Sequence, residues 1–151
     1  MKSPQADEVK DFLLSRQQQA SSINSGERRR QWIRAVEKLY QQVTEELLAE
    51  SIAQRLVRVS RSKKEITEQY LGSYRVPELV LDINGETVRF SPKGRNIMGS
   101  KGRVDLVGEL DTVTLILEAA GHWSIVLSRA PREVVTLDSK ALAEALRRVM
   151  R

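Results

Sequence analysis

ELVLDINGETVRF, residues 78–90, combines two alternating segments with a tight turn between them. Asn84-Gly85 favours a two-residue type I′ turn, because both turn positions need a positive φ angle. Pairing outward from this turn places six residues on one face, five of them apolar: Ile83 with Glu86, Leu81 with Val88, and Leu79 with Phe90. A slip by one residue would turn every one of them to the other face. The segment therefore predicts a β-hairpin with one buried face.

Alternating segments continue after the hairpin and predict a meander. They lie at RVDLV (103–107), at TVTLILEA (112–119) and at WSIVLSR (123–129). We expect a further short edge strand in APREVVTL (130–137) and a short strand at residues 96–98, inside the Gly- and Lys-rich connection 91–102. Residues 54–76 are ambiguous, since their apolar positions fit the end of a helix or the beginning of a strand. The sheet is therefore expected to have five to seven antiparallel strands.

Helical periodicity dominates the N-terminal third. Residues 3–20 begin with a capping Ser3 and Pro4, and they carry a short apolar face of Val9, Phe12, Leu13 and Ala20. SSINSG, residues 21–26, predicts a break, because Ser, Asn and Gly are poor helix formers. Apolar residues then recur at three- and four-residue spacing from about Ser25 to about Ala53. These segments predict a helical hairpin or pair, whose long second helix either covers the protein's own sheet or pairs with a second copy.

The C-terminal residues predict a last helix packed on the sheet. Asp138 is in position to be its N-cap, and Leu137 and Leu142 have the spacing of a hydrophobic staple. The expected fold class is therefore α+β in a single domain, 1–151, with a helical segment (1–53), an antiparallel sheet (54–137) and a C-terminal helix (138–151). Seven strands followed by a helix match the element count of a pleckstrin-homology-like barrel, but no motif supports that resemblance and the chain is assigned to no family.

Composition restricts the classes of function more than it selects one. The 151-residue chain is 40% hydrophobic and 30% charged, has a net charge of +5 and contains no cysteine. The missing thiols exclude disulfides and zinc–thiolate sites. Acidic residues near the N-terminus stand where a signal peptide needs an apolar stretch, and no stretch approaches about 18 consecutive apolar residues. We therefore expect a cytoplasmic protein without a membrane span.

The usual catalytic constellations are not recognisable in the sequence. His122 is the single histidine and lies in a predicted turn. The carboxylate pairs Asp7/Glu8 and Glu45/Glu46 are adjacent on helices, so each pair points in two directions about 100° apart. The sequence therefore leans against an enzyme and indicates no catalytic residue, cofactor or metal.

Basic residues form the candidate contact sites for an anion or nucleic acid. The connection 91–102 and its flank supply Lys93, Arg95, Lys101 and Arg103 among three glycines, whose backbone N–H groups can turn toward a phosphate. Two further clusters contribute Arg28, Arg29 and Arg30, and Arg58 and Arg61. The alternative for each cluster is an ordinary solvated surface, and sequence does not say whether the clusters share a face.

The leading functional hypothesis is a non-enzymatic binding or scaffolding protein. It would act through a protein partner or through self-association, with a homodimer through the long N-terminal helix as one form. The alternative is binding of nucleic acid or another polyanion through the basic clusters.

Overall fold

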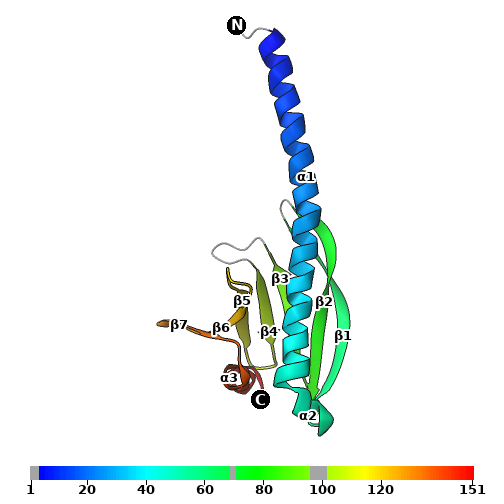
Figure 1. Ribbon diagram of the computed structural model, residues 1–151. Helices are drawn as coiled ribbons and strands as arrows, with labels where there is room; N and C mark the ends of the chain where they lie inside the picture. The colour runs from blue at the N-terminus through cyan, green and yellow to red at the C-terminus, as the bar shows by residue number, and fades with distance from the viewer. Residues whose placement is uncertain (1–3, 69–70, 96–101) are drawn as a thin grey trace.

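The computed structural model describes the backbone of residues 4–68, 71–95 and 102–151, and the side chains of all of these except residues 4–6 and 15–25. A long N-terminal helix lies along one face of an antiparallel sheet, and a short C-terminal helix packs on the same face (Figure 1). The expected α+β fold class is therefore confirmed.

Seven strands follow one another across a single sheet in the order of the chain. They are β1 (Arg58–Glu68), β2 (Gly72–Ile83), β3 (Glu86–Gly94), β4 (Arg103–Val107), β5 (Thr112–Leu117), β6 (Trp123–Arg129) and β7 (Arg132–Thr136). Every neighbouring pair is antiparallel, so β1 and β7 form the two edges. The ambiguous segment 54–76 thus contributes β1 and the first part of β2, whereas the short strand expected at residues 96–98 lies outside the described residues.

The hairpin between β2 and β3 has the predicted register. Leu79, Leu81 and Ile83 pair with Phe90, Val88 and Glu86 respectively. Asn84 and Gly85 adopt φ angles of 54° and 86°, as a type I′ turn requires. The turn is further held by Asp82, whose Oδ1 accepts a hydrogen bond of 2.9 Å from the Gly85 N–H.

Helix α1 (Pro4–Gln41) is one continuous helix of 38 residues. It runs through residues 21–26, so the predicted break is wrong and the expected helical hairpin or pair is a single long helix. Poor helix formers cost only about 0.5–1 kcal/mol each, and helix on both sides outweighs them. The C-terminal part of the predicted helix is instead a π-helical turn (Gln42–Leu47), followed by the short helix α2 (Ala49–Ala53).

The core lies between the sheet and the second half of α1. Trp32, Val36 and Tyr40 of α1 are buried on the apolar face of the sheet. Two aromatic contacts join the helix to the sheet. The ring centroids of Trp32 and Trp123 of β6 are 6.0 Å apart, and those of Tyr40 and Phe90 of β3 are 6.2 Å apart in an edge-to-face contact. The Tyr40 hydroxyl also donates to the Pro77 carbonyl at 2.7 Å.

Helix α3 (Ser139–Val149) completes the core beside α1. Its N-cap is Asp138, as predicted, and Oδ1 of that side chain accepts a hydrogen bond of 2.7 Å from the Ala141 N–H. Leu142, Ala145 and Val149 face the sheet and are buried. Among the described residues no helix combines the length and apolarity needed to cross a membrane.

Candidate functional site

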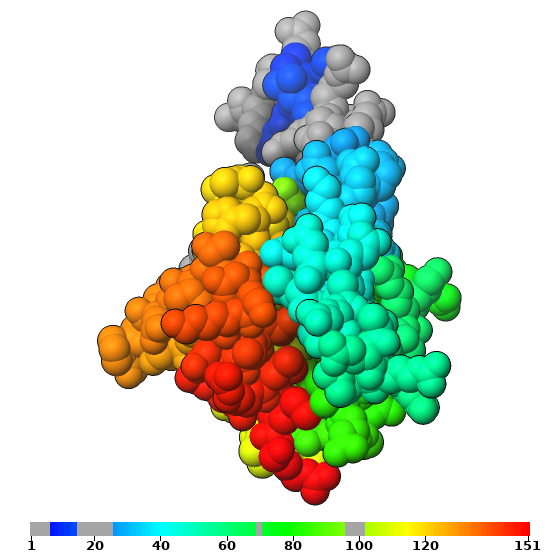
Figure 2. Space-filling model, turned by 60° about the horizontal axis from the view of Figure 1, so that its bottom comes forward, coloured from blue at the N-terminus to red at the C-terminus, as the bar shows by residue number. Residues whose placement is uncertain are grey.

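The first half of α1 projects beyond the sheet. Figures 1 and 2 show this helix leaving the body of the molecule toward the N-terminus. Three apolar side chains in it are largely exposed: Val9 by 58%, Phe12 by 62% and Leu13 by 59%. They stand at three- and four-residue spacing and so share one side of the helix. We call Val9, Phe12 and Leu13 the apolar stripe.

Arg29 is one of the residues of α1 that hydrogen-bond to the body of the molecule. Its guanidinium donates to the Leu71 carbonyl, between β1 and β2, at 3.0 Å. Further along, the Ala35 carbonyl accepts a hydrogen bond of 3.3 Å from the Trp123 indole, and Gln42, just past the end of α1, reaches the Leu137 carbonyl at 3.4 Å. The helix is therefore fixed to the body over its second half.

The apolar stripe faces away from the side of α1 that packs on the sheet. At about 100° per residue, Val9, Phe12 and Leu13 lie about 180°, 120° and 140° around the helix from the buried Val36. The same arithmetic places Arg29 within about 20° of Val36, and Arg29 does contact the body. The stripe is consequently a separate surface, not an extension of the core face.

The predicted basic cluster at Arg28, Arg29 and Arg30 lies where α1 enters the body. Arg28 and Arg30 are exposed, and Arg30 forms an exposed ion pair with Glu27 at 3.3 Å. Arg29 instead binds the Leu71 carbonyl. The cluster thus stands beside the turn between β1 and β2.

Strand register decides which other predicted cations share a face. Arg58, Lys93 and Arg103 belong to the sheet face opposite α1, which we call the open face. Arg61 belongs to the helix-covered face, where its guanidinium pairs with Glu37 at 2.5 Å and lies over the Tyr40 ring. The sheet therefore separates Arg61 from the other three.

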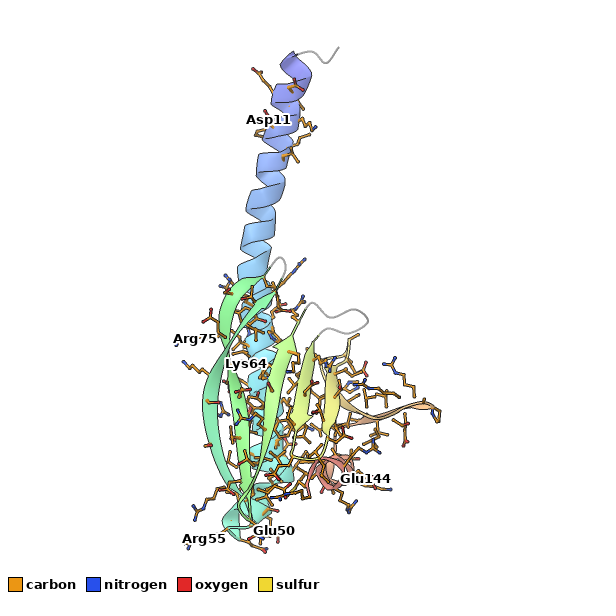
Figure 3. All side chains as sticks on the ribbon, turned by 180° about the vertical axis from the view of Figure 1, so that it is seen from behind. Asp11, Glu50, Arg55, Lys64, Arg75 and Glu144 are labelled. Atoms are coloured by element: carbon orange, nitrogen blue, oxygen red, sulfur yellow. The ribbon has the colours of Figure 1, made fainter. Side chains whose placement is uncertain are left out.

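The remaining predicted cations are Arg95 and Lys101. Arg95 follows β3, and its backbone N–H donates to Glu68 Oε1 at 2.7 Å. It also lines a small hollow of about 190 Å³ with Gln31 and Trp32 of α1, so it lies at the same end of the sheet as Arg28–Arg30. Lys101 lies outside the described residues. Arg58 begins β1 at the opposite end, near the labelled Arg55 (Figure 3).

The open face carries a buried polar network that sequence reasoning missed. Asp105 is only 4% exposed, although it lies on the face without helices. The Arg103 guanidinium donates two hydrogen bonds to the Asp105 carboxylate, of 2.8 and 3.1 Å, and the Thr114 hydroxyl donates to the same carboxylate at 3.4 Å. These bonds raise the pKa of Arg103 above its ordinary value. Arg103 is thus already paired within the chain.

Lys64 lies on the same face (Figure 3). Its ammonium donates to the Ser91 hydroxyl at 3.0 Å and to the Pro92 carbonyl at 3.2 Å. Burial, and then the nearby charge of Lys93, lower the pKa of Lys64. Two cations are therefore held close together on this face, where the charges of the buried Glu78 and Asp105 partly offset the lowering of the Lys64 pKa. Lys64 lies in the segment 54–76 that the sequence left ambiguous, so only the strand register places it beside Lys93.

The described residues contain no group of three or more potential ligands that could hold a metal ion. His122 is exposed in the turn between β5 and β6. A hollow of about 380 Å³ between β7 and α3 has Leu127, Val135 and Ala141 among its lining residues, together with charged side chains.

No protein-family model matches the chain, and neither the curated proteins nor the solved structures include a match to it. The projecting helix, the basic cluster and the open face are therefore interpreted from their own geometry.

Proposed function

We propose that this chain is a non-enzymatic binding protein that acts through protein–protein contacts, and that the projecting half of α1 is its binding element. The observation that carries the proposal is the apolar stripe, with its three side chains 58–62% exposed on a helix that extends past its own sheet. Large exposed apolar side chains that cluster on one surface are typical of interaction sites. The sheet and α3 then serve as the rigid base that holds the helix.

Site-specific photocrosslinking in the cell tests this proposal. A photoreactive phenylalanine analogue at Leu13 should form adducts with a defined protein. The same analogue at Lys38, which is exposed on the side of α1 away from the sheet but within the packed half, is the matched control. The purified partner should then lose about tenfold or more in affinity for the variant Val9→Ser/Leu13→Ser, because the buried apolar area is lost. Equal adducts at both positions, or none at Leu13, would contradict the proposal.

Binding of a polyanion is a second candidate, favoured by the open face. Five cations from three strands lie on it: Arg58 and Lys64 of β1, Arg89 and Lys93 of β3, and Arg103 of β4. Lys64 and Lys93 repel each other, and an anion bound between them would reduce this repulsion.

A salt series with random-sequence RNA and DNA tests the second candidate. Binding to phosphates should weaken steeply with salt, because bound counterions are released. The variant Lys64→Gln/Lys93→Gln should bind more weakly, whereas Lys140→Gln, on α3, should bind as the wild type does. Absence of binding at low salt would remove this candidate.

A further inference from the structure

Strand β1 is a long edge of the sheet. It is 11 residues in length, it is mostly exposed, and among the described strands it pairs with β2 alone (Figure 1). The opposite edge, β7, has only 5 residues. An edge strand carries backbone N–H and C=O groups that no neighbouring strand uses, and a further strand can pair with them. β1 therefore offers a template for an added strand.

The hairpin register shows which residues of β1 direct these groups outward. Successive residues of an antiparallel strand turn their N–H and C=O groups alternately to its two sides. The residues that flank the type I′ turn form a hydrogen-bonded pair, so odd-numbered residues of β2 bond to β3 and even-numbered ones bond to β1. The even-numbered residues of β1 are their partners. The backbone groups of Val59, Arg61 and Lys63 consequently point away from the sheet.

The same edge is strongly basic. Residues 54–64 contain five cations and no acid. Arg58, Arg61 and Lys63 are exposed; Arg61 pairs with Glu37 of α1, whereas Arg58 and Lys63 form no ion pair within the part of the chain that the structure describes. Side chains alternate between the faces of a strand, so Arg58 lies on the open face and Lys63 on the other. A strand added to β1 would therefore meet cations on both of its faces.

We infer that the β1 edge binds an extended acidic segment of a partner protein by strand addition, along residues 58–64. Backbone pairing supplies the affinity of such a complex, and the flanking side chains supply its specificity. The cations hinder pairing with β1 of a second copy, because like charges would lie side by side, but they attract an acidic strand. A nucleic acid matches the charge but has no peptide backbone to pair. Because it lies on the sheet, this surface is independent of the apolar stripe on α1.

Fluorescence anisotropy with a labelled synthetic peptide tests the β1 edge on the purified full chain. The probe has about eight residues, glutamate alternating with threonine, and it should bind. In two further peptides the backbone nitrogens of either the glutamates or the threonines are methylated. One of these should bind about tenfold or more weakly and the other nearly as the parent does, because only alternate N–H groups of an added strand face β1. Absence of binding, or equal effects of the two methylations, would overturn strand addition; equal binding of all three peptides would show attraction by charge alone.

Variants at Lys63 separate the charge from the backbone pairing. Lys63→Gln removes a cation and should weaken the parent peptide about threefold. Lys63→Pro also removes the outward N–H, which the β1–β2 ladder does not use, and should weaken binding by about tenfold more. The matched control is Arg132→Gln, an exposed cation on the opposite edge, which should bind as the wild type does. Equal binding by the two Lys63 variants would contradict the inference; thermal unfolding checks that both fold, and the methylated peptides decide if the proline variant does not.

Amide exchange followed by nuclear magnetic resonance locates the peptide on the chain. In the free protein, the amides of Val59, Arg61 and Lys63 should exchange faster than those of Ser60 and Ser62, which bond to β2. Saturating peptide should slow the first three. Unchanged exchange at these three amides with peptide bound would place the peptide elsewhere and overturn the site.

The remaining outcomes concern other occupants and the other surface. The chain mass is 17.1 kDa, and a dimer in sedimentation equilibrium that Lys63→Pro dissociates would identify a second copy as the occupant of β1 and overturn the acidic segment. Val9→Ser/Leu13→Ser should leave peptide binding unchanged. Loss of the photocrosslinked partner and loss of the peptide are thus separate results, so failure of either surface is recognised without the other.

Discussion

Gly85 shows how one backbone angle can decide the stability of a hairpin. Its φ angle of 86° lies in a region that β-branched residues resist, and a Cβ built there would meet no atom within 4 Å. Gly85→Val should therefore destabilise the protein by about 1–2 kcal/mol through backbone strain alone. Urea unfolding followed by circular dichroism measures this difference. Thr87→Val, an exposed change in β3, should stay within about 0.5 kcal/mol; a similar loss at both positions would contradict the explanation from φ.

Tyr40 links stability to alkaline pH. Burial, and then the charge of Glu78, raise the pKa of Tyr40 above its usual value of 10.0. The folded protein thus retains a proton that the unfolded chain releases, and this stabilisation is present below pH 10 and is lost as pH rises above it. Tyr40→Phe should cost about 1 kcal/mol at pH 7, because the hydrogen bond to the Pro77 carbonyl disappears. Above pH 10 the variant should lose less stability per pH unit than the wild type.

The measurement for Tyr40 is the free energy of unfolding between pH 7 and pH 11. Tyr74 is the matched comparison, since burial and the Glu68 carboxylate also raise its pKa. Tyr74→Phe should likewise reduce the loss of unfolding free energy per pH unit above pH 10. An unaltered slope in both variants would show that another group controls the alkaline transition.

Among the elements, α3 depends on its N-cap. Asp138→Ala removes the acceptor for the Ala141 N–H and should destabilise the protein by about 1 kcal/mol. Asp138→Asn keeps a side-chain oxygen in place and should lose much less. Thermal unfolding compares the two variants, and an equal loss in both would indicate that the carboxylate charge matters more than the hydrogen bond.

The elements also show what sequence can predict. The β2–β3 hairpin and the α3 cap depend on residues close in the chain, so the local sequence pattern is sufficient to predict them. The continuity of α1 is different, because Ser, Asn and Gly at 21–26 lower helix propensity only slightly and the decision lies with the flanking helix. The phase of the apolar stripe relative to the core face follows only once that continuity is known.

Among the candidate site residues, contacts across strands were the part that sequence could not provide. Arg103 was predicted as an anion contact, but its guanidinium pairs with Asp105 two residues further along β4, and Asp105 accepts a hydrogen bond from Thr114 through the register of β4 with β5. The placement of Arg61 under α1 likewise depends on which sheet face the helix covers. The charge of a basic residue is known from the sequence, but its ion-pair partner is known only from the fold.

For the whole molecule, the two halves of α1 should exchange backbone hydrogen differently. Residues 4–25 belong to the half of the helix that projects beyond the sheet, whereas residues 29–41 lie on the sheet. Amides of residues 4–25 should therefore exchange faster than those of residues 29–41. Hydrogen exchange of the purified chain followed by mass spectrometry measures this. Equal protection of the two segments would contradict the expectation.

The contact between the Ala35 carbonyl and the Trp123 indole joins residues that are 88 positions apart. On the ribosome, β6 is therefore made long after α1 has emerged, by roughly 4–18 s at 5–20 residues per second. Strands β1 to β5 can pair in the order of their synthesis, because each neighbour in the sheet is also the neighbour in the chain. The nascent N-terminal helix lacks its contact with Trp123 until β6 is made, so a chain interrupted before β6 would expose part of its core face and be prone to aggregate.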